Sequence, residues 1–158
     1  MLVMHRVNIA ISLIFITCVF VVTYFIYMEK SKNILPETPL KTLHLESASV
    51  KISIAEDEDL QLKGLSGIEQ LPSGYGLFFV FKEEGFHGIW MKDMKFPIDI
   101  IWMDKKLQVI DIKKDISPDT YPELFYPQTP ALFVLEVEAG FSIKNNVKVG
   151  TIGFWGDL

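Results

Sequence analysis

The chain begins with one long apolar segment. Residues 9–28 contain no charged side chain, and a helix of these 20 residues would extend about 30 Å, which matches the hydrocarbon core of a bilayer. The segment has no polar face, and Tyr24 and Tyr27 lie near its end, where interfacial aromatic residues are common. We therefore predict a transmembrane helix over 9–28, which makes the lipid bilayer a partner of the chain.

A cleaved signal peptide is the alternative interpretation of this segment. Its apolar region would be shorter and would end in small residues, whereas here the exit carries large aromatic side chains. The sequence therefore favours an uncleaved signal anchor, followed by a proline-containing linker over 29–40 and a folded domain over 41–158. Arg6 precedes the segment and Lys30, Lys32 and Lys41 follow it, so the positive charges do not favour a cytoplasmic N-terminus. The short charged N-terminal tail nevertheless resembles that of a signal anchor, and it favours a domain outside the cytoplasm.

After the linker the pattern becomes that of short strands. Apolar and polar residues alternate, or apolar residues run together, between turn residues, which is typical of β-structure. Two short helices complete the pattern, the first with acids at its start and Gly64 at its end. The expected strands are a hairpin over 43–54 and then 75–81, 86–92, 98–103, 107–113, 132–138 and 149–155, and the expected helices are 56–65 and 141–146.

Many short strands with little helix predict an all-β domain, mainly an antiparallel sandwich or barrel. We find no glycine-rich phosphate loop, no alternation of strand and helix, and no internal repeat. The long segment 115–131 contains four prolines. It is either a binding loop or an ordered crossover that covers a sheet edge.

Charge and cysteine content exclude several classes of function. The chain has a net charge of −5, and the domain has no arginine, so a nucleic-acid partner is not expected. A single cysteine, Cys18, excludes an internal disulfide and a Cys-rich metal site. His87 and Met91 share a strand face, but they are about 13 Å apart along a strand, too far for one metal ion. The sequence therefore predicts no metal and no cofactor.

Two acids stand among apolar strand residues. Asp99 alternates with Ile101 and Met103, and Glu136 lies within the apolar run 133–137. A buried carboxylate needs hydrogen bonds or a cation, and Lys92 is the nearest cation in the pattern. We therefore expect Lys92, Asp99 and Glu136 to form one structural polar network, with no catalytic residue.

The alternative is that Asp99 and Glu136 act as an acid and base pair. A separation of about 5–10 Å within an open cleft would favour that alternative. The aromatic residues Trp90 and Phe79, together with Val134, are expected in the core.

Several motifs occur in an order that resembles the family known as domain of unknown function 192. The resemblance covers residues 48–155, and it implies a compact β-sandwich, often preceded by an export signal, with no established reaction. Carried over to this chain, the family-like polar positions are Lys92, Asp99, Tyr121 and Glu136. The matching motifs are Lys63-Gly64-Leu65, Gly76–Phe81, Trp90-Met91-Lys92-Asp93, Phe96–Ile100, Tyr121-Pro122, Pro130-Ala131 and Val134–Gly140.

These observations predict a single-pass protein of the cell membrane whose β domain lies in the cell envelope. We expect the domain to bind an unknown small ligand or envelope protein without catalysis. The candidate ligand-binding residues are Trp90, Lys92, Asp99, Tyr121 and Glu136. A small carboxylate-based hydrolase that uses Asp99 and Glu136 is the alternative function.

Overall fold

The computed structural model describes residues 15–24 and 41–156. The chain divides into two compact units, residues 1–34 and 35–158. In the first unit, residues 15–24 are helical. None of the described helices has both the length and the apolar character needed to cross a bilayer. Parts of the predicted anchor, 9–14 and 25–28, and the predicted linker 29–40 lie outside the described residues.

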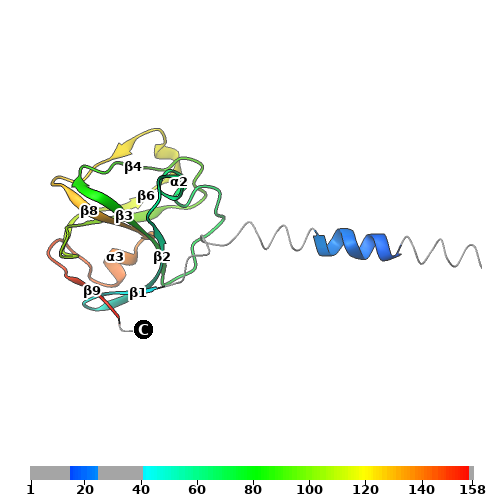
Figure 1. Cartoon of the computed structure of the whole chain (residues 1–158), viewed down its shortest axis with the longest axis horizontal. Helices are drawn as coiled ribbons and strands as arrows, with labels where there is room; N and C mark the ends of the chain where they lie inside the picture. The colour runs from blue at the N-terminus through cyan, green and yellow to red at the C-terminus, as the bar shows by residue number, and fades with distance from the viewer. Residues whose placement is uncertain (1–14, 25–40, 157–158) are drawn as a thin grey trace, which may run out of the picture. The chain divides into compact units, whose positions relative to one another are not determined.

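The second unit is built on one mostly antiparallel sheet, which curls into a half-barrel (Figure 1). Its order is β6-β5-β8-β3-β2-β1-β9, and an isolated pairing of Gln108 with Ile152 bridges its two edges. The strands are β1 Lys41–Leu45, β2 Ala48–Ala55, β3 Tyr75–Gly85, β5 Ile98–Met103, β6 Val109–Ile116, β8 Ala131–Glu138 and β9 Gly153–Trp155. The mostly β fold is thus confirmed, but the domain has one principal curled sheet where a sandwich would have two stacked sheets.

One strand pair differs from the expected antiparallel pattern. β2 and β3 run parallel, and the helix α2, Glu58–Lys63, lies in the connection between them. Parallel neighbours need a crossover, so a strand–helix–strand unit is present here although we expected none. The side chain of Asp57 caps the start of α2, and Gly64 ends it, as the acidic start and the glycine predicted.

Both faces of the sheet are buried, which explains why all six residues of β5 are buried. One face packs Phe78, Ile101 and Leu135 with Phe141 of the helix α3, Phe141–Lys144. The opposite face packs a second cluster that includes Phe79 and Val134. Burial of Phe79 and Val134 is confirmed.

The predicted strand 86–92 is mostly absent. Only β4, Ile89–Trp90, forms there, and it pairs with β7, Leu124–Phe125, from the long proline-containing segment. That segment also contains a short 3-10 helix, Pro118–Thr120. Trp90 is 37% exposed, so its expected burial is wrong. Trp90 lies on a two-stranded ribbon outside the principal sheet, so the packed faces of that sheet do not bury it.

Candidate functional site

Glu136 is the residue around which the site is built. It lies in the middle of β8, opposite Ile100 of β5 and Leu77 of β3, and only 4% of its surface is exposed. Cross-strand partners point to the same face, so its carboxyl group enters the apolar layer that contains Phe79 and Val134.

The carboxyl group of Glu136 lacks a full set of hydrogen-bond partners. Its Oε2 atom is buried and accepts no hydrogen bond, and none of the ion pairs among the described residues includes it. Burial removes the water that would stabilise a charge, and it raises the pKa of Glu136 from 4.5 to about 8. At neutral pH the group is therefore mostly an uncharged carboxylic acid, which has a proton to donate.

A pocket of about 310 Å³ opens above this carboxyl group, and we call it the Glu136 pocket. A second hollow of about 350 Å³ shares five lining residues with it and continues it along α2. The Glu136 pocket is lined by Gln61, Leu62, Lys63, Gly64, Leu65, Ser66, Phe79, Gly88, Ile89, Trp90, Met94, Leu124 and Glu136. Its walls are mainly apolar, and Glu136 is the acid among these residues.

The end of α2 forms one wall of the Glu136 pocket. Gly64 has φ of 53° and ψ of −134°, a conformation that side chains oppose, and a Cβ there would be 3.8 Å from Glu136 Oε2. The residues that follow Gly64 bond to the segment just after residue 90, because Ser66 Oγ donates to Lys92 O and Gly67 N donates to Asp93 O. Glycine at 64 thus lets the chain pass over the acid without filling the space.

The ribbon of β4 and β7 forms the other wall. Its pairs are Ile89 with Phe125 and Trp90 with Leu124. The Nε1 atom of Trp102, from β5, donates to the carbonyl of His87 at 2.9 Å and fixes the start of the ribbon to the sheet. A packed, anchored ribbon gives the pocket a preformed shape, which small-molecule sites usually have.

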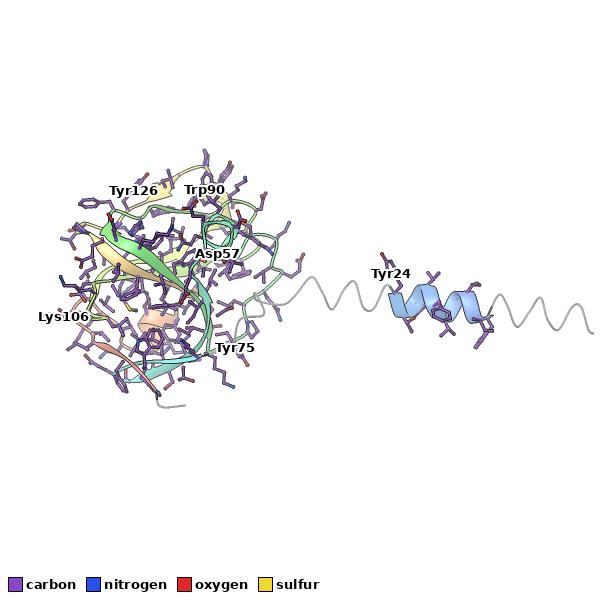
Figure 2. The ribbon with its side chains drawn as sticks, viewed as in Figure 1. Tyr24, Asp57, Tyr75, Trp90, Lys106 and Tyr126 are labelled. Carbon is purple, nitrogen blue, oxygen red and sulfur yellow. The ribbon has the colours of Figure 1, made fainter. Side chains whose placement is uncertain are left out.

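Three of the predicted site residues meet at the rim of the Glu136 pocket. Lys92 Nζ lies 5.6 Å from the centre of the Trp90 ring, and the Tyr121 ring meets that ring edge-on at 5.9 Å between centres. Trp90 and Tyr126 lie toward the upper end of the domain in Figure 2, on the same side as α2 in Figure 1. This part of the rim is an exposed aromatic surface, and Lys92 lies beside it.

Asp99 does not belong to this site. It pairs with Val137, one position along from Glu136, so the two carboxyl groups point to opposite faces of the sheet. Asp99 is fully buried and accepts hydrogen bonds from the backbone N–H groups of Asp115, Gly140 and Ser142, at 2.9, 3.2 and 2.8 Å. The single network of Lys92, Asp99 and Glu136 is therefore not formed, and Asp99 instead joins the end of β6 to the start of α3.

Sequence reasoning missed the role of Asp111. This buried acid of β6 accepts a hydrogen bond from Gln128 N at 3.0 Å and lies 3.6 Å from Lys113 Nζ. It thereby ties the proline-containing segment, and with it β7, to the sheet. An acid alternating with Val109 in a predicted strand was the available signal, although Asp111 is also followed by charged residues that suggest an exposed face.

Comparison with known proteins places this domain in a family. The profile of the DUF192 family, described as "Uncharacterized ACR", matches residues 40–152. The chain belongs to the DUF192 family. The match includes every residue that lines the Glu136 pocket, so the site lies within the DUF192 domain itself.

Two solved structures share the DUF192 fold of this chain. A protein of Sinorhizobium meliloti 1021, described as "a putative transcription regulator", is 21% identical, with a TM-score of 0.70 over 75% of this chain and 97% of its own. A protein of unknown function from Novosphingobium aromaticivorans DSM 12444 is 23% identical, with a TM-score of 0.69 over 77% of this chain and 91% of its own. No curated protein matches the chain. These likenesses show the fold alone, so the function of the DUF192 domain has to be inferred from its site.

Proposed function

We propose that this protein is a non-catalytic binding domain that takes a small ligand into the Glu136 pocket. In this proposal residues 9–28 hold the protein in the cell membrane, and the domain faces the cell envelope. The observation that supports binding most strongly is the Glu136 carboxyl group, buried at the base of an open apolar pocket with one oxygen unpaired.

An unpaired buried polar atom lowers the stability of a fold, so its presence calls for an explanation. A ligand that hydrogen-bonds to it would supply that explanation. The pocket has the features of small-molecule sites, which combine mostly apolar walls with few polar groups. Its volume of about 310 Å³ suits a ligand of modest size.

The geometry argues against the hydrolase that would use both acids. Such an enzyme needs its two carboxyl groups in one cleft, about 5–10 Å apart. Asp99 instead lies on the other face of the sheet and is satisfied by three N–H groups. This removes the partner that Glu136 would need.

The membrane part of the proposal rests on the sequence. The run 9–28 is long enough to span a bilayer and carries no charge. Its exit lacks the small residues that a signal peptidase requires. Positive charges stand on both sides, Arg6 before the run and Lys30 and Lys32 after it, so the orientation rests on the short N-terminal tail, which supports an external domain.

Titration of the full chain, in detergent micelles, with benzyl alcohol tests the binding proposal. We expect saturable shifts of the backbone amide signals of Gly64, Gly88 and Trp90. Gly64→Ala should weaken binding several-fold, because its methyl group would lie 3.7 Å from Phe79 and 3.8 Å from Glu136 Oε2.

Gly67→Ala is the matched control for this titration. Gly67 also has a positive φ, of 76°, but a Cβ there meets nothing within 4 Å. It should therefore carry a similar backbone strain without entering the pocket. Absence of saturable shifts, or equal weakening by the two substitutions, would contradict the binding proposal.

A further inference from the structure

We propose that the ligand is an uncharged carbonyl compound with a small apolar body, whose carbonyl oxygen accepts a hydrogen bond from Glu136. This inference rests on the proposed binding function and names the chemical class of ligand. It follows from three properties of the Glu136 pocket: the protonation of its acid, the charges at its mouth and the nature of its walls.

The first property is that Glu136 is a donor. The groups that face it from the neighbouring strands are Ile100 of β5 and Leu77 of β3, which carry no charge. No cation among the described residues pairs with it, and burial raises its pKa to about 8. A carboxylic acid kept neutral by apolar surroundings donates a hydrogen bond, so its best partner is an acceptor.

The second property is the sign of the charge at the mouth. Lys63 lines the pocket from the end of α2, and Lys92 lies over Trp90 on the opposite side. Glu58 lines the adjoining hollow, where it lies 3.7 Å from Lys82. A cationic ligand would be repelled by the two ammonium groups, and it would pair well with Glu136 only if that buried acid lost its proton. A neutral hydrogen-bond acceptor is not repelled, and it binds the protonated acid directly.

The third property is that the remaining lining offers contact surface to an apolar body. Phe79, Ile89 and Met94 are buried side chains that line the pocket, and Trp90 closes its rim. A carbonyl group on an apolar body therefore matches the unpaired carboxyl oxygen of Glu136 and the walls together. An anionic ligand would place its charge beside Phe79, where water cannot solvate it.

Three probes of nearly the same shape separate the possibilities. Acetophenone carries the carbonyl group, ethylbenzene lacks a polar group, and 1-phenylethylammonium replaces the carbonyl with a cation. Each is titrated into the full chain in micelles, with its free concentration fixed by dialysis, while the amide signals of Gly64, Gly88 and Trp90 are followed.

We expect acetophenone to bind at least tenfold more tightly than either of the other probes at pH 7. Equal or tighter binding of ethylbenzene or of the ammonium probe would overturn the assignment of ligand class and leave the binding function intact. If none of the three probes shifts the pocket amides, the binding function itself is wrong.

The pH dependence gives a second readout. Acetophenone should bind about tenfold more weakly at pH 9 than at pH 7, because Glu136 loses the donated proton near pH 8. Glu136→Gln keeps an N–H donor that does not titrate, so its binding should be constant over this range. Glu136→Leu should lose the preference for acetophenone over ethylbenzene. A constant affinity in the wild-type protein would contradict donation by Glu136.

Discussion

Asp99 and Glu136 lie on neighbouring strands, one step apart in register, and the pleat of the sheet sends their side chains to opposite faces. Asp99 meets three backbone N–H groups. Glu136 meets an apolar layer and keeps an unpaired oxygen. An acidic side chain thus stabilises the fold at one position, and at the other it is the binding group that we propose.

Glu136 should make the stability of the protein depend on pH. Its pKa is about 8 in the folded protein and 4.5 ordinarily, so the folded state keeps a proton that the unfolded chain releases. The free energy of unfolding therefore falls as pH rises from 4.5 to 8. Glu136→Gln should remove this loss and stabilise the protein by about 3 kcal/mol at pH 7, with little effect at pH 4.5.

Thermal melts of wild type and Glu136→Gln across this range measure the effect. Glu69→Gln, which changes an exposed acid, is the control and should follow the wild type. A gap between Glu136→Gln and wild type that does not widen with pH would show that Glu136 is already charged in the folded protein.

Asp99→Asn should have the opposite sign. The amide group places an NH₂ where one carboxylate oxygen accepts a backbone N–H, so at least one of the three hydrogen bonds is lost. We expect the free energy of unfolding to fall by about 2–4 kcal/mol. Chemical denaturation measures this, with Asp119→Asn as an exposed control. A loss below that of the control would show that the three N–H groups find other partners.

The sequence predicted the burial of Asp99 and Glu136 but not how these two acids are used. Each acid stands among apolar residues, and that local pattern is sufficient to predict burial. Whether they meet depends on the register between β5 and β8, which are separated by β6 and a long proline-containing segment. A shift of one residue exchanges the faces, and the apolar pattern does not fix the register here because both faces of the sheet are buried.

At the scale of elements, the two walls of the Glu136 pocket differ in how well the local sequence predicts them. The wall from α2 was predictable, because an acidic start and a terminal glycine are encoded within a few residues. The ribbon of β4 and β7 was not, because each strand has two residues and its partner is more than 30 positions away. The parallel pair β2 and β3 was missed because α2 has only six residues.

The ribbon wall should depend on Asp111. Asp111→Ala removes the acceptor of Gln128 N and frees the segment that carries β7. We expect a loss of about 1–3 kcal/mol in unfolding free energy, with faster hydrogen exchange at the Gln128 and Phe125 amides. Asp119→Ala, an exposed acid in the same segment, should leave both unchanged. Unaltered exchange in Asp111→Ala would mean that other contacts hold the ribbon.

At the scale of the whole molecule, a DUF192 domain of one curled sheet follows a segment that the sequence predicts to span the membrane. The pattern of apolar and polar residues predicted a mostly β domain, because short alternating runs between turn residues are typical of strands. It did not distinguish a curled single sheet from a sandwich, since both bury apolar residues in the same alternation. The order of strands depends on contacts between distant parts of the chain.

Protease accessibility tests the proposed orientation. Protease added to intact spheroplasts should digest the domain, while a cytoplasmic marker remains whole. Full protection of the domain would reverse the orientation. Sequencing the mature N-terminus completes the test, because a start near residue 28 would show that the segment is removed.

The pKa of Glu136, with and without a ligand, tests the central claim most directly. The side-chain carboxyl carbon can be followed by NMR in the full chain as pH is raised, and Glu136→Gln assigns the signal. We predict a midpoint near 8 that moves upward when acetophenone is added, because the ligand binds the protonated form. A midpoint near 4.5 that acetophenone leaves unchanged would contradict both the neutral acid and its role in binding.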